Sequence, residues 1–262
     1  MNHYISNAIA NTYPKLEFPL IHMTENIGTI EQIIENGFRF SYCKESLCDL
    51  KRCIEFSYPM VSFSHLPHYQ AQHILRTYGH LSIGMKSEWA IKNKLNPVLY
   101  FERNSSITKI ILESFDILNN VPTNTIKSSI CNLLIGEQHK YYKQSFGIAS
   151  FSKNFYGSLI RDGSTIDNHY CFGAESEWRL ILQKDNIEPF VLREEKKEDF
   201  NKAAHKEFLT FEFDDIAYFG VEAEFQEERI KGFLVKKFNA TSYQVSKINF
   251  HYDLTRSVPD EG

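Results

Sequence analysis

Residues 18–40 read FPLIHMTENIGTIEQIIENGFRF, a stretch whose pattern indicates a strand followed by a helix. The apolar run Phe18 to Met23 predicts a strand. Thr24 or Asn26 can cap a helix that begins after it, and Gly37 can end that helix because glycine accepts the left-handed conformation. The spacing of three and four residues between the isoleucines predicts one apolar helix face, formed by Ile27, Ile30, Ile33 and Ile34.

His22 therefore falls where a strand meets a helix N-terminus, which is a place to bind the oxygens of a nucleotide. The alternative is a core histidine that caps its own loop. The sequence around His22 leaves both interpretations open.

The composition is that of a globular protein. The 262 residues are 42% hydrophobic and 24% charged, and 14% are aromatic, which favours a sheet-rich core. A net charge of −4 argues against a large basic nucleic-acid face. No apolar run is long enough to span a membrane, and the N-terminus lacks signal-peptide features, so we expect a cytoplasmic protein. The five cysteines show no zinc-binding spacing and are expected to be reduced.

Periodicity and turn residues predict an irregular mixture of helices and strands. No glycine-rich phosphate loop occurs, so the doubly wound nucleotide folds are unsupported and the predicted class is α+β. We predict strands over 60–65, 81–85, 98–101, 177–183, 190–193, 208–213 and 216–221. We predict helices over 44–54, 68–78, 87–95 and 223–236, a helical insert over about 104–145, a loop over 145–170 and a loose tail from 249.

The clearest candidate for chemistry is the segment Glu175-Ser176-Glu177-Trp178-Arg179. In a strand, Glu175, Glu177 and Arg179 share one face because side chains alternate. A glutamate beside an arginine is most often a structural ion pair. The functional alternative is a carboxylate that holds a sugar hydroxyl and stabilises a cationic transition state.

Several motifs, in this order, resemble the AbiGi-type abortive-infection proteins of bacterial phage defence. They are the strand–HxT–helix–NG pattern at the start, VSFSHLP from Val61, ESEWRLIL from Glu175 and FLTFEFDDIAYFGV from Phe208. The resemblance spans residues from about 18 to 235. It implies a role in phage defence, and one role it implies is that of a non-catalytic antitoxin.

The same pattern is similar, more distantly, to ADP-ribosyltransferases of the DarT and CmdT type. This resemblance implies a single domain over 1–262 with a split β-sheet core and the helical insert. It implies that Glu177 grips the ribose of NAD, that Glu175 orients the acceptor, and that Tyr78 stacks on nicotinamide. The sequence departs from that pattern, since no clean Ser-Thr-Ser triplet occurs. The residues that would bind NAD are His22, Met23, Thr24, Ser62, Phe63 and Ser64.

Two functions follow from these resemblances. The first is an NAD-dependent ADP-ribosyltransferase, a toxin that modifies RNA by preference or else a protein acceptor, without a metal. Its transition state would be oxocarbenium-like, and a nearby carboxylate would stabilise it. The alternative is a non-catalytic antitoxin that binds a partner toxin, marked by an exposed apolar surface on the helical insert or on the last helix. Basic residues that could line a groove for RNA are Lys51, Arg52, Arg76, Lys86, Lys92, Lys94 and Arg103.

Overall fold

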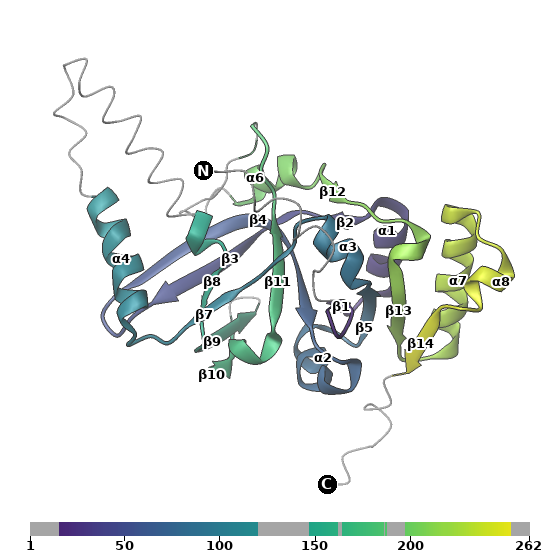
Figure 1. Cartoon of the computed structure of the whole chain (residues 1–262), viewed down its shortest axis with the longest axis horizontal. Helices are drawn as coiled ribbons and strands as arrows, with labels where there is room; N and C mark the ends of the chain where they lie inside the picture. The colour runs from purple at the N-terminus through teal and green to yellow at the C-terminus, as the bar shows by residue number, and fades with distance from the viewer. Residues whose placement is uncertain (1–15, 120–146, 162–163, 186, 188–196, 253–262) are drawn as a thin grey trace, which may run out of the picture. The chain divides into compact units, whose positions relative to one another are not determined.

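The computed structural model describes residues 16–119, 147–161, 164–185, 187 and 197–252. Helices and strands succeed one another irregularly along these residues, which confirms the α+β class (Figure 1). Contacts group the chain into two compact units. Unit 1 comprises Met1–Glu35, His65–Lys94 and Phe211–Gly262, and unit 2 comprises Asn36–Ser64 and Leu95–Thr210. A core like that of the ADP-ribosyltransferases is not confirmed, and the single domain over 1–262 stays a prediction.

Unit 1 is built on four strands in the order β14-β13-β5-β1. β13 pairs in parallel with β14 and antiparallel with β5, which in turn pairs antiparallel with β1. Its strands are β1 (Leu20–Thr24), β5 (Leu81–Met85), β13 (Ile216–Val221) and β14 (Asn249–Tyr252). Its helices are α1 (Ile27–Asn36), η1 (His68–Gln70), α2 (Gln72–Tyr78), α3 (Ser87–Lys92), η5 (Phe213–Asp215), α7 (Glu224–Phe238) and α8 (Ser242–Val245).

The opening stretch folds as its pattern predicts. α1 buries Ile30, Ile33 and Ile34. The Asn26 Oδ1 accepts a hydrogen bond from the Gly28 backbone N at 2.7 Å, and the Thr24 Oγ1 accepts one from the Asn26 backbone N at 3.3 Å. Both candidate capping residues therefore contribute to the start of the helix. Gly37, with φ at 96°, ends it as predicted.

Unit 2 contains the long hairpin β3–β4, and β11 pairs antiparallel with both β4 and β6. Smaller pairs are β7–β8, β9–β10 and β2–β12. Its strands are β2 (Phe38–Arg39), β3 (Ser41–Cys48), β4 (Cys53–His65), β6 (Asn96–Pro97), β7 (Leu99–Phe101), β8 (Ser152–Asn154), β9 (Tyr156–Arg161), β10 (Ser164–Cys171), β11 (Glu177–Ile181) and β12 (Phe208–Leu209). Its helices are α4 (Ser106–Asn119), η3 (Phe172–Glu175) and α6 (Lys197–Ala204).

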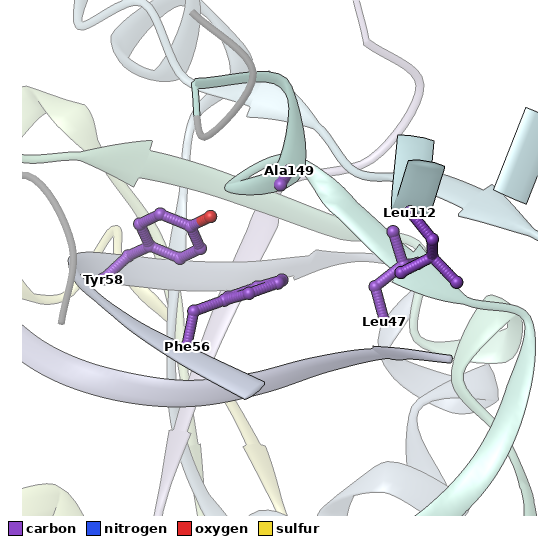
Figure 2. Close-up of a cluster of buried hydrophobic side chains, with 5 residues drawn as sticks. All are labelled: Leu47, Phe56, Tyr58, Leu112 and Ala149. Atoms are coloured by element: carbon purple, nitrogen blue, oxygen red, sulfur yellow. The ribbon is translucent and has the colours of Figure 1, made fainter. Parts of the chain in front are cut away.

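A buried apolar cluster lies where the hairpin meets α4. Figure 2 shows Leu112 of α4 against Leu47 of β3, with the rings of Phe56 and Tyr58 on β4 and Ala149 above them. The helix α4 confirms the first half of the predicted insert, and residues 120–146 lie outside the described residues. Burial of these side chains is the main favourable term in holding the hairpin and α4 together.

The helix predicted over 44–54 is wrong, because these residues form the turn end of the β3–β4 hairpin. Leu47 and Ile54 match a helical spacing, but they lie directly opposite each other in the antiparallel register. The prediction that the cysteines are reduced is wrong for Cys48 and Cys53. They face each other at the end of the hairpin and form a disulfide. Cys43 and Cys171 are free thiols.

Two other segments predicted to be irregular are strands. Residues 145–170 contain β8, β9 and most of β10. β10 is exposed on both faces from Ser164 to His169, so its sequence lacks the apolar alternation that marks a strand. The predicted loose tail begins with β14, where Phe250 stacks on Phe219 with ring centroids 5.7 Å apart.

The remaining predictions differ mainly at their ends. β5 and β13 have the predicted bounds, whereas the strand predicted over 208–213 shrinks to Phe208–Leu209. The strand predicted over 190–193 lies outside the described residues.

Candidate functional site

The central feature of unit 2 is a buried ion pair on β11. Glu177 and Arg179 lie on one face of this strand, as their spacing predicts, and the Arg179 side chain is completely buried. The Arg179 Nε donates to Glu177 Oε1 at 2.6 Å, and its Nη2 donates to Glu177 Oε2 at 2.9 Å. A bidentate pair of this kind fixes both side chains and is among the stronger polar contacts in proteins.

Lys153 of β8 joins the two acidic residues of the motif. Its Nζ donates to Glu177 Oε2 at 3.1 Å and to Glu175 Oε2 at 3.0 Å, and it lies 4.3 Å from the centroid of the Phe172 ring. Glu175 lies before β11, as the predicted strand bounds place it, at the end of the short helix η3 and before Ser176 in a left-handed conformation. Strand alternation therefore does not put Glu175 on the face of Glu177 and Arg179, as we expected from the sequence. The carboxylates of Glu175 and Glu177 still lie close together, because both accept a hydrogen bond from the Lys153 Nζ.

A third carboxylate completes the network. Glu45 of β3 accepts from Arg179 Nη2 at 2.7 Å, and Arg179 Nη1 donates to the Ser150 carbonyl at 3.0 Å. The backbone N of Glu177 donates to the Tyr100 hydroxyl at 2.9 Å. Glu45 and Lys153 were not among the predicted site residues, because they fell in a predicted helix and a predicted loop. We name Glu45, Lys153, Glu175, Glu177 and Arg179 the buried ion network.

The charges of this network shift one another's pKa values. Burial by itself would raise the pKa of the Glu177 carboxyl, but Arg179 and Lys153 outweigh it and lower that pKa to about 2. Burial would lower the pKa of Arg179 and of Lys153, and the surrounding carboxylates raise both. Burial raises the pKa of the Glu45 carboxyl. Glu177 is therefore ionised at neutral pH and held between two cations.

This geometry favours the structural interpretation of the Glu177–Arg179 pair. Both oxygens of Glu177 already accept hydrogen bonds from cations within unit 2. A carboxylate that grips a ribose hydroxyl also has to be accessible to the substrate, and Glu177 is only 7% exposed. Removing Glu177 from its cations would leave buried charges without a partner, which is costly.

The serine-bearing strand lies beside β11. Ser64 is opposite Glu177, Phe63 opposite Trp178 and Ser62 opposite Arg179 in the antiparallel register. Ser62 is half-buried and Ser64 is buried. The ring of Phe63 is buried against Phe38, with centroids 4.9 Å apart, so its side chain belongs to the core.

The other predicted site residues belong to unit 1. His22, Met23 and Thr24 are half-buried on β1, opposite Ile83, Ser82 and Leu81 of β5. Met23 packs against the apolar cluster under α2, and Tyr78 ends that helix. The structure thus gathers the predicted residues into two groups, one in each unit. A common NAD site for His22 and Glu177 stays a prediction.

The chain is similar to a family of phage-resistance proteins. A family model described as "Putative abortive phage resistance protein AbiGi, antitoxin" matches residues 35–222, which is more than half of the 262 residues. The chain therefore belongs to the AbiGi family. Searches of curated proteins and of solved structures found no match. The comparisons do not support the resemblance to ADP-ribosyltransferases. No helix in the described part of the chain is long and apolar enough to cross a membrane.

We expect the carboxylates of the buried ion network to differ in importance. Glu177→Gln places an amide N–H against the donors of Arg179 and Lys153, and should lower the free energy of unfolding by about 3 kcal/mol. Glu45→Gln keeps an acceptor for Arg179 and removes a charge that burial already disfavours, so it should cost under about 1 kcal/mol. Urea denaturation of both variants measures the difference, and equal costs would contradict it.

The network also predicts a loss of stability in acid. Because the folded-state pKa of Glu177 is below its unfolded value, its contribution is complete above about pH 4.5 and falls away towards pH 2. The contribution lost is about 3 kcal/mol. Glu45 acts in the opposite sense, since its raised pKa favours the folded state as pH falls. Urea midpoints at pH 5 and pH 3 should differ more for the wild type than for Glu177→Gln; equal differences would refute this role.

Proposed function

We propose that this chain is the antitoxin of an abortive-infection system and neutralises a cognate toxin by direct binding. The observation that carries the proposal is the match to the AbiGi family over residues 35–222, whose description names an antitoxin. A binding function needs a stable scaffold and an exposed surface, and it needs no reactive carboxylate.

The buried ion network supports a scaffold role for the acidic motif. Glu177 and Glu175 make their hydrogen bonds to Lys153 and Arg179 inside unit 2, and both are more than nine-tenths buried. In this proposal the motif ESEWRLIL fixes β11 against β3, β4 and β8. Its acidic residues hold the structure that presents the binding surface.

Exposed apolar side chains within the matched residues supply a candidate surface for the toxin. On α4, Ile107 and Ile110 are more than half exposed, one turn apart. On the β9–β10 pair, Ile160 is 60% exposed and Ile166 is 62% exposed. Removing such side chains from water lowers the free energy of a complex and so favours binding. Their exposure agrees with the apolar surface expected of an antitoxin.

The test is capture of the protein encoded beside this one. We expect the tagged wild-type chain to co-purify with that protein and to restore growth when both are expressed. Ile110→Glu and Ile160→Glu should weaken capture at least tenfold if these side chains contact the toxin. Tyr243→Glu is the control, because Tyr243 is equally exposed but lies outside residues 35–222.

An enzyme would give a different result. If the purified chain consumes NAD or modifies RNA, and if it neither binds nor neutralises the neighbouring protein, the antitoxin proposal fails. If none of the surface variants weakens capture, the toxin contacts another surface of the chain.

A further inference from the structure

The outward face of α7 carries apolar side chains that the described residues of unit 1 leave partly exposed. This helix buries Gln226, Ile230 and Leu234 on its inner side. On the opposite side Phe225 is 61% exposed and Val235 is 44% exposed. With 3.6 residues per turn, Phe225, Gly232 and Val235 fall in one stripe. We call this stripe the outer face of α7, the yellow-green helix in Figure 1.

Gly232 lies at the centre of the outer face. A Cβ atom added there would meet nothing within 4 Å, and its φ is not positive. Neither the packing of the described residues nor the backbone conformation requires glycine at position 232, although glycine inside a helix is less favourable than alanine. A missing side chain lets a second helix approach closely, since interaxial distance depends on the side chains at the contact.

The charged side chains on either side of Gly232 have opposite signs, so this face can pair with the same face of a second copy of the chain. Glu228 lies four residues before Gly232 and Lys236 four residues after it, both on the outer face and both exposed. In an antiparallel pair of α7 helices related by a two-fold axis at Gly232, each Glu228 meets Lys236 of the other copy. The ion pair of Glu228 with Lys231 at 2.8 Å is on the surface and is therefore weak enough to exchange.

We propose that the chain forms a homodimer through antiparallel pairing of α7. A two-fold interface must be self-complementary, and the outer face meets this condition in charge and in its central glycine. The helix lies outside the matched residues 35–222 and contains none of the side chains proposed to contact the toxin. A helix of 15 residues spans only about 22 Å, so we expect a small interface and a dissociation constant of roughly micromolar order.

Sedimentation velocity of the full chain between about 1 and 100 µM, a range that brackets the expected constant, tests the proposal. The wild type should shift from monomer to dimer across this range. Gly232→Leu should stay monomeric, because it fills the crossing point while its helix propensity protects the fold. Lys236→Glu and Glu228→Lys should each stay monomeric because they place like charges opposite each other.

Charge exchange identifies the contact itself. The double variant Glu228→Lys with Lys236→Glu should dimerise again, and a mixture of the two single variants should form heterodimers. A wild type that stays monomeric at about 100 µM, well above the expected constant, overturns the proposal. So does a dimer that none of these substitutions alters. If the wild type is monomeric and Lys236→Glu abolishes toxin capture, the outer face binds the toxin instead.

Discussion

Replacing Arg179 by Met should lower the free energy of unfolding by about 3 to 5 kcal/mol. Arg179 is completely buried, and it donates one hydrogen bond to Glu45 and two to Glu177. Methionine fills much of the volume but removes the hydrogen bonds that Arg179 donates to Glu45 and Glu177. Urea denaturation followed by circular dichroism measures the loss.

Two comparisons separate this effect from a general cost of removing charge. Lys202→Met breaks the exposed pair with Asp199 on α6 and should leave the urea midpoint unchanged. The double variant of Arg179→Met with Glu177→Met removes both partners and should cost less than Arg179→Met alone, because no charge at that pair is left unpaired. An Arg179→Met midpoint equal to that of wild type would show that the buried ion network contributes no stability.

Replacing Gly79 by Ala should destabilise unit 1 by about 2 to 4 kcal/mol. Gly79 follows Tyr78 at the end of α2 with φ at 113°, a region that residues with a side chain rarely adopt. An added Cβ would also lie 2.2 Å from the carbonyl carbon of Thr24. That neighbour is backbone of β1, so the strand itself would have to move.

The control for this substitution is Gly147→Ala. A Cβ at Gly147 would meet nothing within 4 Å, and the φ of Gly147 is not positive. We expect its thermal midpoint to match or slightly exceed that of wild type. A Gly79→Ala protein that melts with the wild-type midpoint would contradict the close approach of α2 and β1.

The sequence predicted correctly those helices and strands whose apolar residues follow a clear local pattern. α1 is found because Ile30, Ile33 and Ile34 repeat at helical spacing, and β5 and β13 are found because short apolar runs end at turn residues. The β3–β4 hairpin was missed because Leu47 and Ile54 match a helical spacing. Their pairing across a turn depends on contacts between strands, which a helical count cannot show.

The candidate site could be predicted only in part for a similar reason. The alternation of β11 placed Glu177 and Arg179 on one face, and the structure confirms it. Their partners Lys153 and Glu45 are 24 and 132 residues before Glu177, in segments whose patterns indicated a loop and a helix. Whether a charged side chain is exposed or buried in a network depends on these distant partners, so sequence alone left the role of Glu177 open.

Growth rescue by Glu177→Gln separates binding from catalysis. If this chain neutralises a toxin by binding, Glu177 serves only as part of the scaffold. The assay expresses the neighbouring toxin with wild type or Glu177→Gln at a temperature where circular dichroism shows the variant folded and at matched protein levels. We expect equal rescue and equal capture of the toxin by both proteins. A folded Glu177→Gln that captures the toxin but fails to restore growth would contradict it, because Glu177 would then perform chemistry.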